Sequence, residues 1–144
     1  MSNTKPVPAS IIELLGQRPP DAITLLRLGE LVSIGRGREA FELVLDAAMN
    51  KAGSKPDACA MAMRLIEGMM DSTAWLGGYL MARLYPKAEE AKAHGVCDAI
   101  ELWMADSASH RLADTLDALA REGVRPRMQK LYTTWSLAIR RKLA

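Results

Sequence analysis

Glycine and proline divide this chain of 144 residues into short segments with a helical pattern of apolar residues, and this punctuation constrains the fold most. Gly35, Gly53 and Gly123 each follow a segment whose apolar residues recur three and four positions apart, as expected where helices end. Pro56 and Pro126 stand where the next segments begin, and proline fits the first turn of a helix. The punctuation therefore predicts helices joined by short turns.

We expect about eight helices from this pattern. The final segment has the clearest spacing, because its apolar residues Met128, Leu131, Tyr132, Trp135 and Ile139 form one stripe. The expected helices are a short one from Ser10 to Gly16, then 20–34, 36–52, 56–70, 72–85, a short one from Asp98 to Met104, 110–122, and one from Pro126 onward. Residues 86–94 are almost entirely Lys, Glu and Ala, so we expect that piece to be solvated if it is helical.

The composition supports an all-α fold. Apolar residues make up 49% of the chain, which is enough for a core, whereas aromatic residues make up 5% and few runs are β-branched, which disfavours a β-sandwich or barrel. Helices of this length with short connections form antiparallel hairpins, stacked either as a short α-solenoid or as a compact bundle. We expect a single domain over 1–144, with residues 1–9 as a flexible N-terminus.

An internal repeat favours the solenoid. Gly53-Ser54-Lys55-Pro56 recurs as Gly123-Val124-Arg125-Pro126, and the two glycines are 70 residues apart. This spacing is close to two helical-hairpin repeats, since the tetratricopeptide unit has about 34 residues. The middle copy is weak, because position 88 is not glycine and the nearest candidate, Gly95, is displaced by seven residues.

The segment from Arg36 to Leu43, continuing to Pro56-Asp57, resembles a pentatricopeptide repeat, in which Gly-x-x-x-Glu-Ala-x-x-Leu opens a helix and Gly-x-x-Pro-Asp joins repeats. Ala120 to Pro126 looks like the same junction. The resemblance implies a helical-repeat fold and, in such proteins, single-stranded RNA is read by polar residues near the start of each first helix. Here Ala58, Cys59, Ala60 and Met61 follow the junction, and their side chains cannot hydrogen-bond to a base edge.

The last 45 residues are similar in order to small tetratricopeptide-like chaperones of bacterial type III secretion systems. They contain a short Trp-containing segment, a Leu-Ala helix, the Arg125-Pro126-Arg127 turn and an amphipathic last helix. This likeness implies a protein that holds an aggregation-prone helical partner in a concave groove.

Methionine is the candidate contact residue for such a partner, because its flexible side chain adapts to irregular surfaces. The predicted partner-binding groove comprises Met61, Met63, Met70, Trp75 and Met81. The same residues also fit a soft core between two helices, and the sequence leaves both readings open.

Candidates for chemistry are few. His94, Cys97 and His110 suggest zinc ligands, but there is no Cys-x-x-Cys pair, and a fourth ligand would have to be Asp98 or Asp106. The acid pairs Glu89-Glu90 and Asp114/Asp117 are typical of solvated helix faces. We therefore expect no enzyme activity, no metal and no cofactor.

Charge is concentrated at the C-terminal end. Residues 121–144 hold seven bases and one acid, Glu122, although the whole chain has a net charge of only +2. The cations on the last helix lie away from its apolar stripe, so they either form a solvated face that stabilises the helix dipole or bind an anionic partner such as an acidic protein, nucleic acid or lipid surface. The predicted anion-binding residues are Arg125, Arg127, Lys130, Arg140, Arg141 and Lys142.

The sequence thus predicts a non-catalytic adaptor or chaperone-like protein that binds another protein, with nucleic-acid binding through the basic C-terminal helix as the alternative. No run of 18 apolar residues is present and the N-terminus lacks an apolar signal core, so we expect neither a membrane span nor export, and a cytoplasmic location. Cys59 and Cys97 do not make a disulfide framework, which fits a reducing compartment.

Overall fold

The computed structural model describes residues 22–50, 52–68 and 74–144. The described chain is helical, with no strands, which confirms the prediction of an all-α fold. The expected short helix from Ser10 to Gly16 and the N-terminus 1–9 lie outside the described residues. The described residues form seven helices: α2 (Ala22–Ser33), α3 (Gly37–Met49), α4 (Lys55–Glu67), α5 (Ala74–Glu90), α6 (His94–Asp106), α7 (His110–Ala120) and α8 (Pro126–Leu143).

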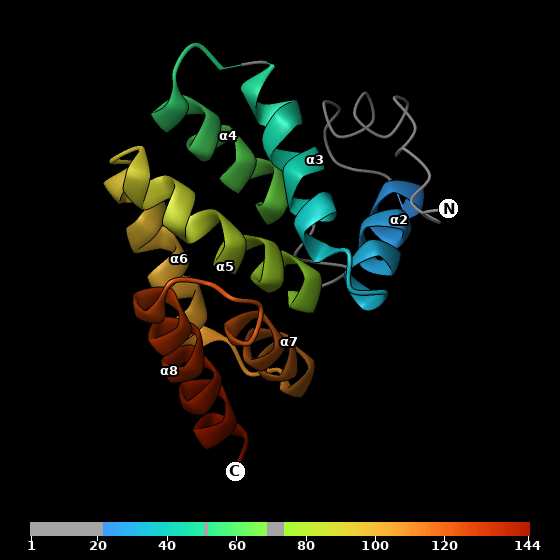
Figure 1. The fold of residues 1–144 in the computed structure, drawn as a ribbon, viewed down its shortest axis with the longest axis vertical. Helices are drawn as coiled ribbons and strands as arrows, with labels where there is room; N and C mark the ends of the chain where they lie inside the picture. The colour runs from blue at the N-terminus through green and yellow to red at the C-terminus, as the bar shows by residue number, and fades with distance from the viewer. Residues whose placement is uncertain (1–21, 51, 69–73) are drawn as a thin grey trace.

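Helix α5 is the centre of the arrangement (Figure 1). Helices α2, α3 and α4 pack against it on one side, and α6 and α7 pack on the other. Each helix from α2 to α5 also packs against the next one along the chain, as in a stack of hairpins, whereas α7 pairs mainly with α8. The buried side chains form one continuous core through all of these helices.

The helix ends explain why the punctuation could be read from the sequence. Ser54 caps α4, where its Oγ accepts a hydrogen bond from the Asp57 backbone N–H at 3.3 Å, and Pro56 occupies the first turn. Ser109 caps α7 in the same way, through the Leu112 N–H at 3.2 Å. Gly35 and Gly123 have backbone φ angles of 82° and 73°, which residues with a side chain rarely adopt.

The junction between α5 and α6 differs from the expectation. Helix α6 begins at His94 rather than near Asp98, and the left-handed residue before it is Lys92, with φ of 58°, instead of a glycine. The middle repeat junction therefore has the helix–turn–helix geometry without the residue that usually marks it.

Pro86 does not end the fifth helix, contrary to the expectation that this helix stops at residue 85. Helix α5 runs through it to Glu90. Proline has no N–H, so the carbonyl of Ala82, four residues earlier, lacks its usual helical donor. The Tyr132 hydroxyl, on α8, donates to that carbonyl at 2.8 Å within the core. A side chain 50 residues away in the sequence thus replaces the missing bond, and Ala88 beyond the proline is fully buried.

Two glycines allow close helix packing around α5. A Cβ added at Gly78 would lie 2.6 Å from the Trp103 ring of α6 and 2.8 Å from Leu112 of α7. A Cβ at Gly37, at the start of α3, would lie 1.8 Å from the hydroxyl oxygen of Tyr79 on α5. Both glycines are therefore required by contact with a neighbouring helix, although neither has a left-handed backbone.

No helix among the described residues is long and apolar enough to span a membrane.

Candidate binding groove

The four described residues of the predicted Met-rich groove lie in different surroundings. Met81 is fully buried and Met63 is 7% exposed, so both belong to the core. Met61 is partly buried, and lines a separate hollow on α4 beside Gly53 and Arg64. Trp75 is half-buried, and the Arg111 guanidinium covers its ring at 3.7 Å from the centroid. Met70 lies outside the described residues.

The physical reason is the position of α4 and α5 between layers. Helices α3, α5 and α6 pack against α4 and bury most of its apolar side chains. Of the two readings of these residues, the soft core describes Met63 and Met81.

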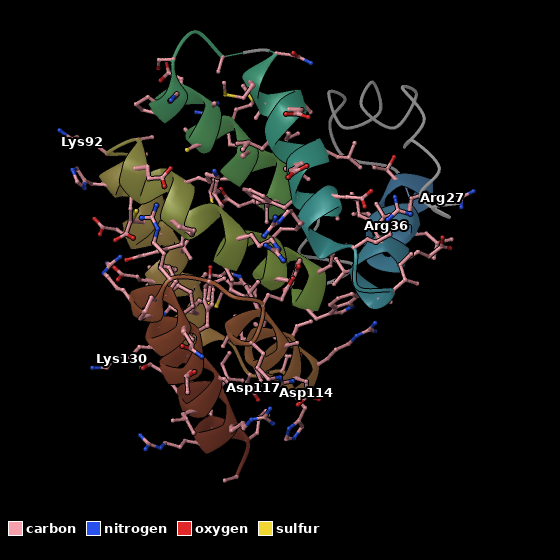
Figure 2. The ribbon with its side chains drawn as sticks, viewed as in Figure 1. Arg27, Arg36, Lys92, Asp114, Asp117 and Lys130 are labelled. Atoms are coloured by element: carbon pink, nitrogen blue, oxygen red, sulfur yellow. The ribbon has the colours of Figure 1, made fainter. Side chains whose placement is uncertain are left out.

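Three of the six predicted anion-binding residues pair with acids of the chain itself. Arg127 forms a bidentate pair with Glu89 of α5 at 2.5 Å, and Arg125 lies 3.4 Å from Glu90. Arg140 bridges both acids of α7, Asp114 at 2.7 Å and Asp117 at 2.6 Å, which lie on α7 in Figure 2. The two acid pairs that were weighed as acid–base groups are thus the structural partners of these arginines.

Lys142 is also engaged, since its ammonium donates to the backbone carbonyls of Ala105 and Ser107 at the end of α6. Of the six predicted residues, only Lys130 and Arg141 have side chains without a hydrogen bond or ion pair within the described chain. Lys130 extends away from α8 into solvent (Figure 2). Three of the seven bases of residues 121–144 are therefore paired with acids of the described chain, and the six predicted residues have different surroundings rather than one common partner.

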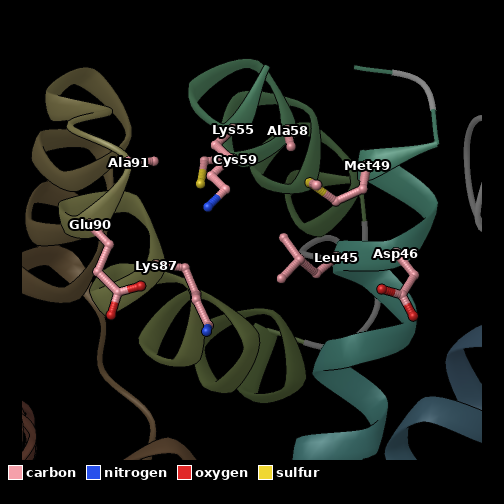
Figure 3. Close-up of a pocket in the computed structure, with 9 residues that line it drawn as sticks. All are labelled: Leu45, Asp46, Met49, Lys55, Ala58, Cys59, Lys87, Glu90 and Ala91. Carbon is pink, nitrogen blue, oxygen red and sulfur yellow. The ribbon is translucent and has the colours of Figure 1, made fainter. Parts of the chain in front are cut away.

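The described surface instead has a hollow between α3, α4 and α5. Its volume is about 300 Å³. Figure 3 shows Leu45 and Met49 approaching from α3, Lys55 and Cys59 from α4, and Lys87 from α5. The side chains of Leu45, Met49, Ala58 and Cys59 make an apolar floor, and the charged groups Asp46, Lys55, Lys87 and Glu90 stand around it.

A second hollow, of about 350 Å³, adjoins the first. Leu45 and Lys87 line both, so the two hollows are neighbours along α3 and α5, and the second one reaches Val124 in the turn before α8. The second hollow has apolar walls from Phe41, Pro86 and Val124, with Tyr132 at its edge. Its charged residues are Arg38, Glu42, Arg83 and Lys87. We call the combined feature the α3–α5 groove.

Arg83 is the most rigidly held charged group of the α3–α5 groove. Its side chain is only 10% exposed. Nε donates to the Tyr79 hydroxyl at 2.6 Å, and Nη2 donates to both Glu122 carboxylate oxygens at 2.8 and 2.9 Å. Nη1 has no hydrogen-bond partner among the described residues. A guanidinium fixed on one edge in this way keeps one donor nitrogen for a ligand.

Apart from Glu90, the other charged groups along the groove form no ion pair within the described chain. Arg38, Lys55 and Lys87 on the basic side, and Glu42 and Asp46 on the acidic side, form no salt bridge within the described chain. Glu90 is paired with Arg125, and Arg83 with Glu122. The groove thus carries one more unpaired base than unpaired acids.

Cys59 is the nucleophilic side chain that lines the groove. Burial raises the pKa of its thiol above the ordinary value, and the charge of Lys87 only partly opposes this effect. A thiol held in its neutral form is a poor nucleophile. The residues that line the groove include no His, Ser or Thr.

The groove was not found by sequence reasoning, because its residues come from segments far apart in the chain. Met49 lies outside the group of methionines from which the sequence predicts a groove, yet it is 45% exposed and contributes to the groove floor. Among the described residues, no group of three or more His, Cys, Asp or Glu is placed to hold a metal ion.

No protein-family model, curated protein or solved structure matches this chain in the comparisons with known proteins.

Proposed function

We propose that this chain is a non-catalytic binding protein that holds a segment of a partner protein in the α3–α5 groove, in a chaperone-like or adaptor-like role. The observation that carries the proposal is the junction of the two hollows at Leu45 and Lys87. Two adjoining hollows of about 300 and 350 Å³ suit successive side chains of one segment better than they suit a single compact ligand.

The lining supports a protein partner. An apolar floor with charged groups around it resembles the general make-up of protein interfaces, in which an apolar centre gives affinity and a polar rim gives orientation. Leu45 lies at the middle of the groove and packs partly against the core, so it offers a fixed apolar surface to an incoming side chain. The neutral Cys59 thiol and the absence of His, Ser and Thr from the lining favour binding over chemistry.

The partner segment is expected to present apolar side chains to Leu45 and Met49 and to leave its polar side chains at the rim. The nucleic-acid alternative has less support, because four of the six cations assigned to it are occupied by Glu89, Glu90, Asp114, Asp117 and the carbonyls at the end of α6.

The test is a selection of 12-residue peptides from a random display library on the full chain, followed by affinity measurements on Leu45→Glu and Leu102→Glu. Leu102 is the matched control because it lies on α6, outside the groove, and is 66% exposed. Selected peptides should bind the wild type and Leu102→Glu equally, and should lose at least about tenfold in affinity for Leu45→Glu, because a carboxylate would then occupy an apolar contact.

Thermal melts of both variants accompany the binding measurement, so that a loss of fold is not mistaken for a loss of the site. Equal binding to all three proteins, or a failure to select any peptide, contradicts the proposed function.

A further inference from the structure

We propose that the partner segment held in the α3–α5 groove is acidic, with Asp or Glu side chains that reach Arg83 Nη1, Arg38 and Lys87 while its apolar side chains occupy the Leu45 and Met49 floor. This inference rests on the proposed function and names the chemistry of the segment.

Arg83 is the first reason. A buried arginine is costly unless its donors are satisfied, and here the Nε and Nη2 edge is satisfied by Tyr79 and Glu122. Nη1 remains, on a side chain that lines the second hollow. A carboxylate oxygen is the group that best accepts from a guanidinium nitrogen, and the fixed position of Arg83 means that little rotamer freedom is lost on binding.

The unpaired bases are the second reason. Arg38 lies in the second hollow, Lys55 in the first, and Lys87 lines both. The unpaired acids of the groove are Glu42 and Asp46, which lie on α3. The excess of bases is small, so we expect a segment with few carboxylates among apolar residues rather than a long run of acids. Because there are bases in both hollows, the segment needs carboxylates at more than one position. Asp and Glu side chains can provide several carboxylates, whereas a C-terminus provides only one.

The contrast with α8 is the third reason. The arginines at positions 125, 127 and 140 each have an acid of this chain within 4 Å, whereas Arg38 and Lys87 lie close to the groove without one. A base that is left unpaired beside an apolar hollow can guide an acidic partner to that hollow.

The experiment compares the peptides selected by three forms of the full chain. The first is the wild type, the second carries Arg38→Gln and Lys87→Gln, and the third carries Lys130→Gln and Arg141→Gln as a control of equal charge change. Neither control residue has an ion pair in the described chain, and neither lines the groove. Arg83 is left unchanged, because its contacts with Tyr79 and Glu122 make it part of the fold.

Peptides selected on the wild type and on the Lys130/Arg141 form should be enriched in Asp and Glu relative to the input library, and this enrichment should be lost on the Arg38/Lys87 form. Individual selected peptides should bind the Arg38/Lys87 form about three- to tenfold more weakly than the wild type at low salt, and this difference should shrink as salt is added.

The outcomes separate the two proposals. If peptides depend on Leu45 but show no enrichment in acids, or the same enrichment on all three forms, the acidic-segment inference is wrong and the groove function stands. If no peptide depends on Leu45, the proposed function itself is wrong. Replacement of the bound peptides by random single-stranded RNA at equal concentration would also overturn the inference, because the groove would then favour phosphate over a protein segment.

Discussion

The two sides of helix α5 use their charged residues in different ways. Toward α8, the acids Glu89 and Glu90 are paired with Arg127 and Arg125. Nearer the C-terminal end of α8, Arg140 is paired with two aspartates of α7. Toward α3 and α4, Arg38, Lys55 and Lys87 stand beside a hollow surface with no such partner in the described chain.

The packing differs in the same way. Tyr132 of α8 enters the core to reach the Ala82 carbonyl, and Trp135 meets Tyr85 edge to face, with ring centroids 5.4 Å apart. On the other side, Leu45 is only partly buried and Met49 is exposed. The comparison suggests that the C-terminal helices stabilise the fold and that the α3–α5 side is available to another molecule.

The largest expected loss of stability comes from disturbing the packing of α6 and α7 against α5. Gly78→Ala places a Cβ against Trp103 and Leu112, so we expect a loss of about 1–3 kcal/mol or more in the free energy of unfolding. Gly95→Ala is the matched control, because its Cβ would meet nothing within 4 Å and alanine is favoured over glycine in a helix. Urea denaturation of both variants checks this, and equal stability of the two would show that α6 and α7 do not press on α5 at Gly78.

The next effect concerns the bond that replaces the one lost at Pro86. Tyr132→Phe removes the donor to a buried carbonyl, so we expect a cost of about 1–3 kcal/mol. Pro86→Ala restores a backbone N–H for that carbonyl, so the cost of Tyr132→Phe should be smaller in the Pro86→Ala background. A double-mutant cycle measured by chemical denaturation gives the answer, and strictly additive effects would contradict the proposed compensation.

A smaller effect is expected from the ion pairs of α7 and α8. Burial raises the pKa of the Asp117 carboxyl, but the Ser136 hydroxyl and the hydrogen bond and charge of Arg140 lower it by more, so that it lies below its ordinary value. A carboxyl whose pKa is lower in the folded state adds stability above its unfolded pKa and loses it as the pH falls through the folded pKa. We therefore expect Arg140→Gln to reduce the loss of stability between neutral pH and acid, measured by urea denaturation across that range. An unchanged acid dependence would mean that this pair does not stabilise the fold.

The smallest effect on stability is expected in the groove. Arg38→Gln and Lys87→Gln remove charges that have no ion pair in the described chain, so the melting temperature should stay close to that of the wild type. Arg127→Gln, which breaks the bidentate pair with Glu89, should lower the melting temperature more than either of them. A larger fall in melting temperature for Arg38→Gln or Lys87→Gln than for Arg127→Gln would mean that the groove bases stabilise the fold and that Arg127 of α8 does not.

The sequence was sufficient for those parts of the fold that depend on neighbouring residues. Ser54 and Ser109 cap helices because their side chains lie three residues before the N–H that they accept from, and Gly35 and Gly123 end helices through their own backbone. Pro86 led to a wrong end for the fifth helix, because Tyr132, which satisfies the Ala82 carbonyl, is far away in the sequence.

The site could not be predicted in the same way. Periodicity showed which faces of α4 and α5 are apolar, but the choice between core and groove at Met63 and Met81 depends on the helices that cover them. The charge of the last helix was correctly located, whereas its compensation depends on pairs such as Arg127 with Glu89, 38 residues apart. Such pairs follow from packing and leave no local pattern.

The most direct measurement is an NMR titration of the full chain, labelled with ¹⁵N, with a peptide selected on the wild type. We expect the amide signals that shift most to belong to α3 and to the second half of α5, around Leu45 and Lys87, and those of Leu102 and Leu137 to stay in place. Shifts centred on Leu102 or Leu137, with α3 unaffected, would contradict the central claim that the α3–α5 groove is the binding site.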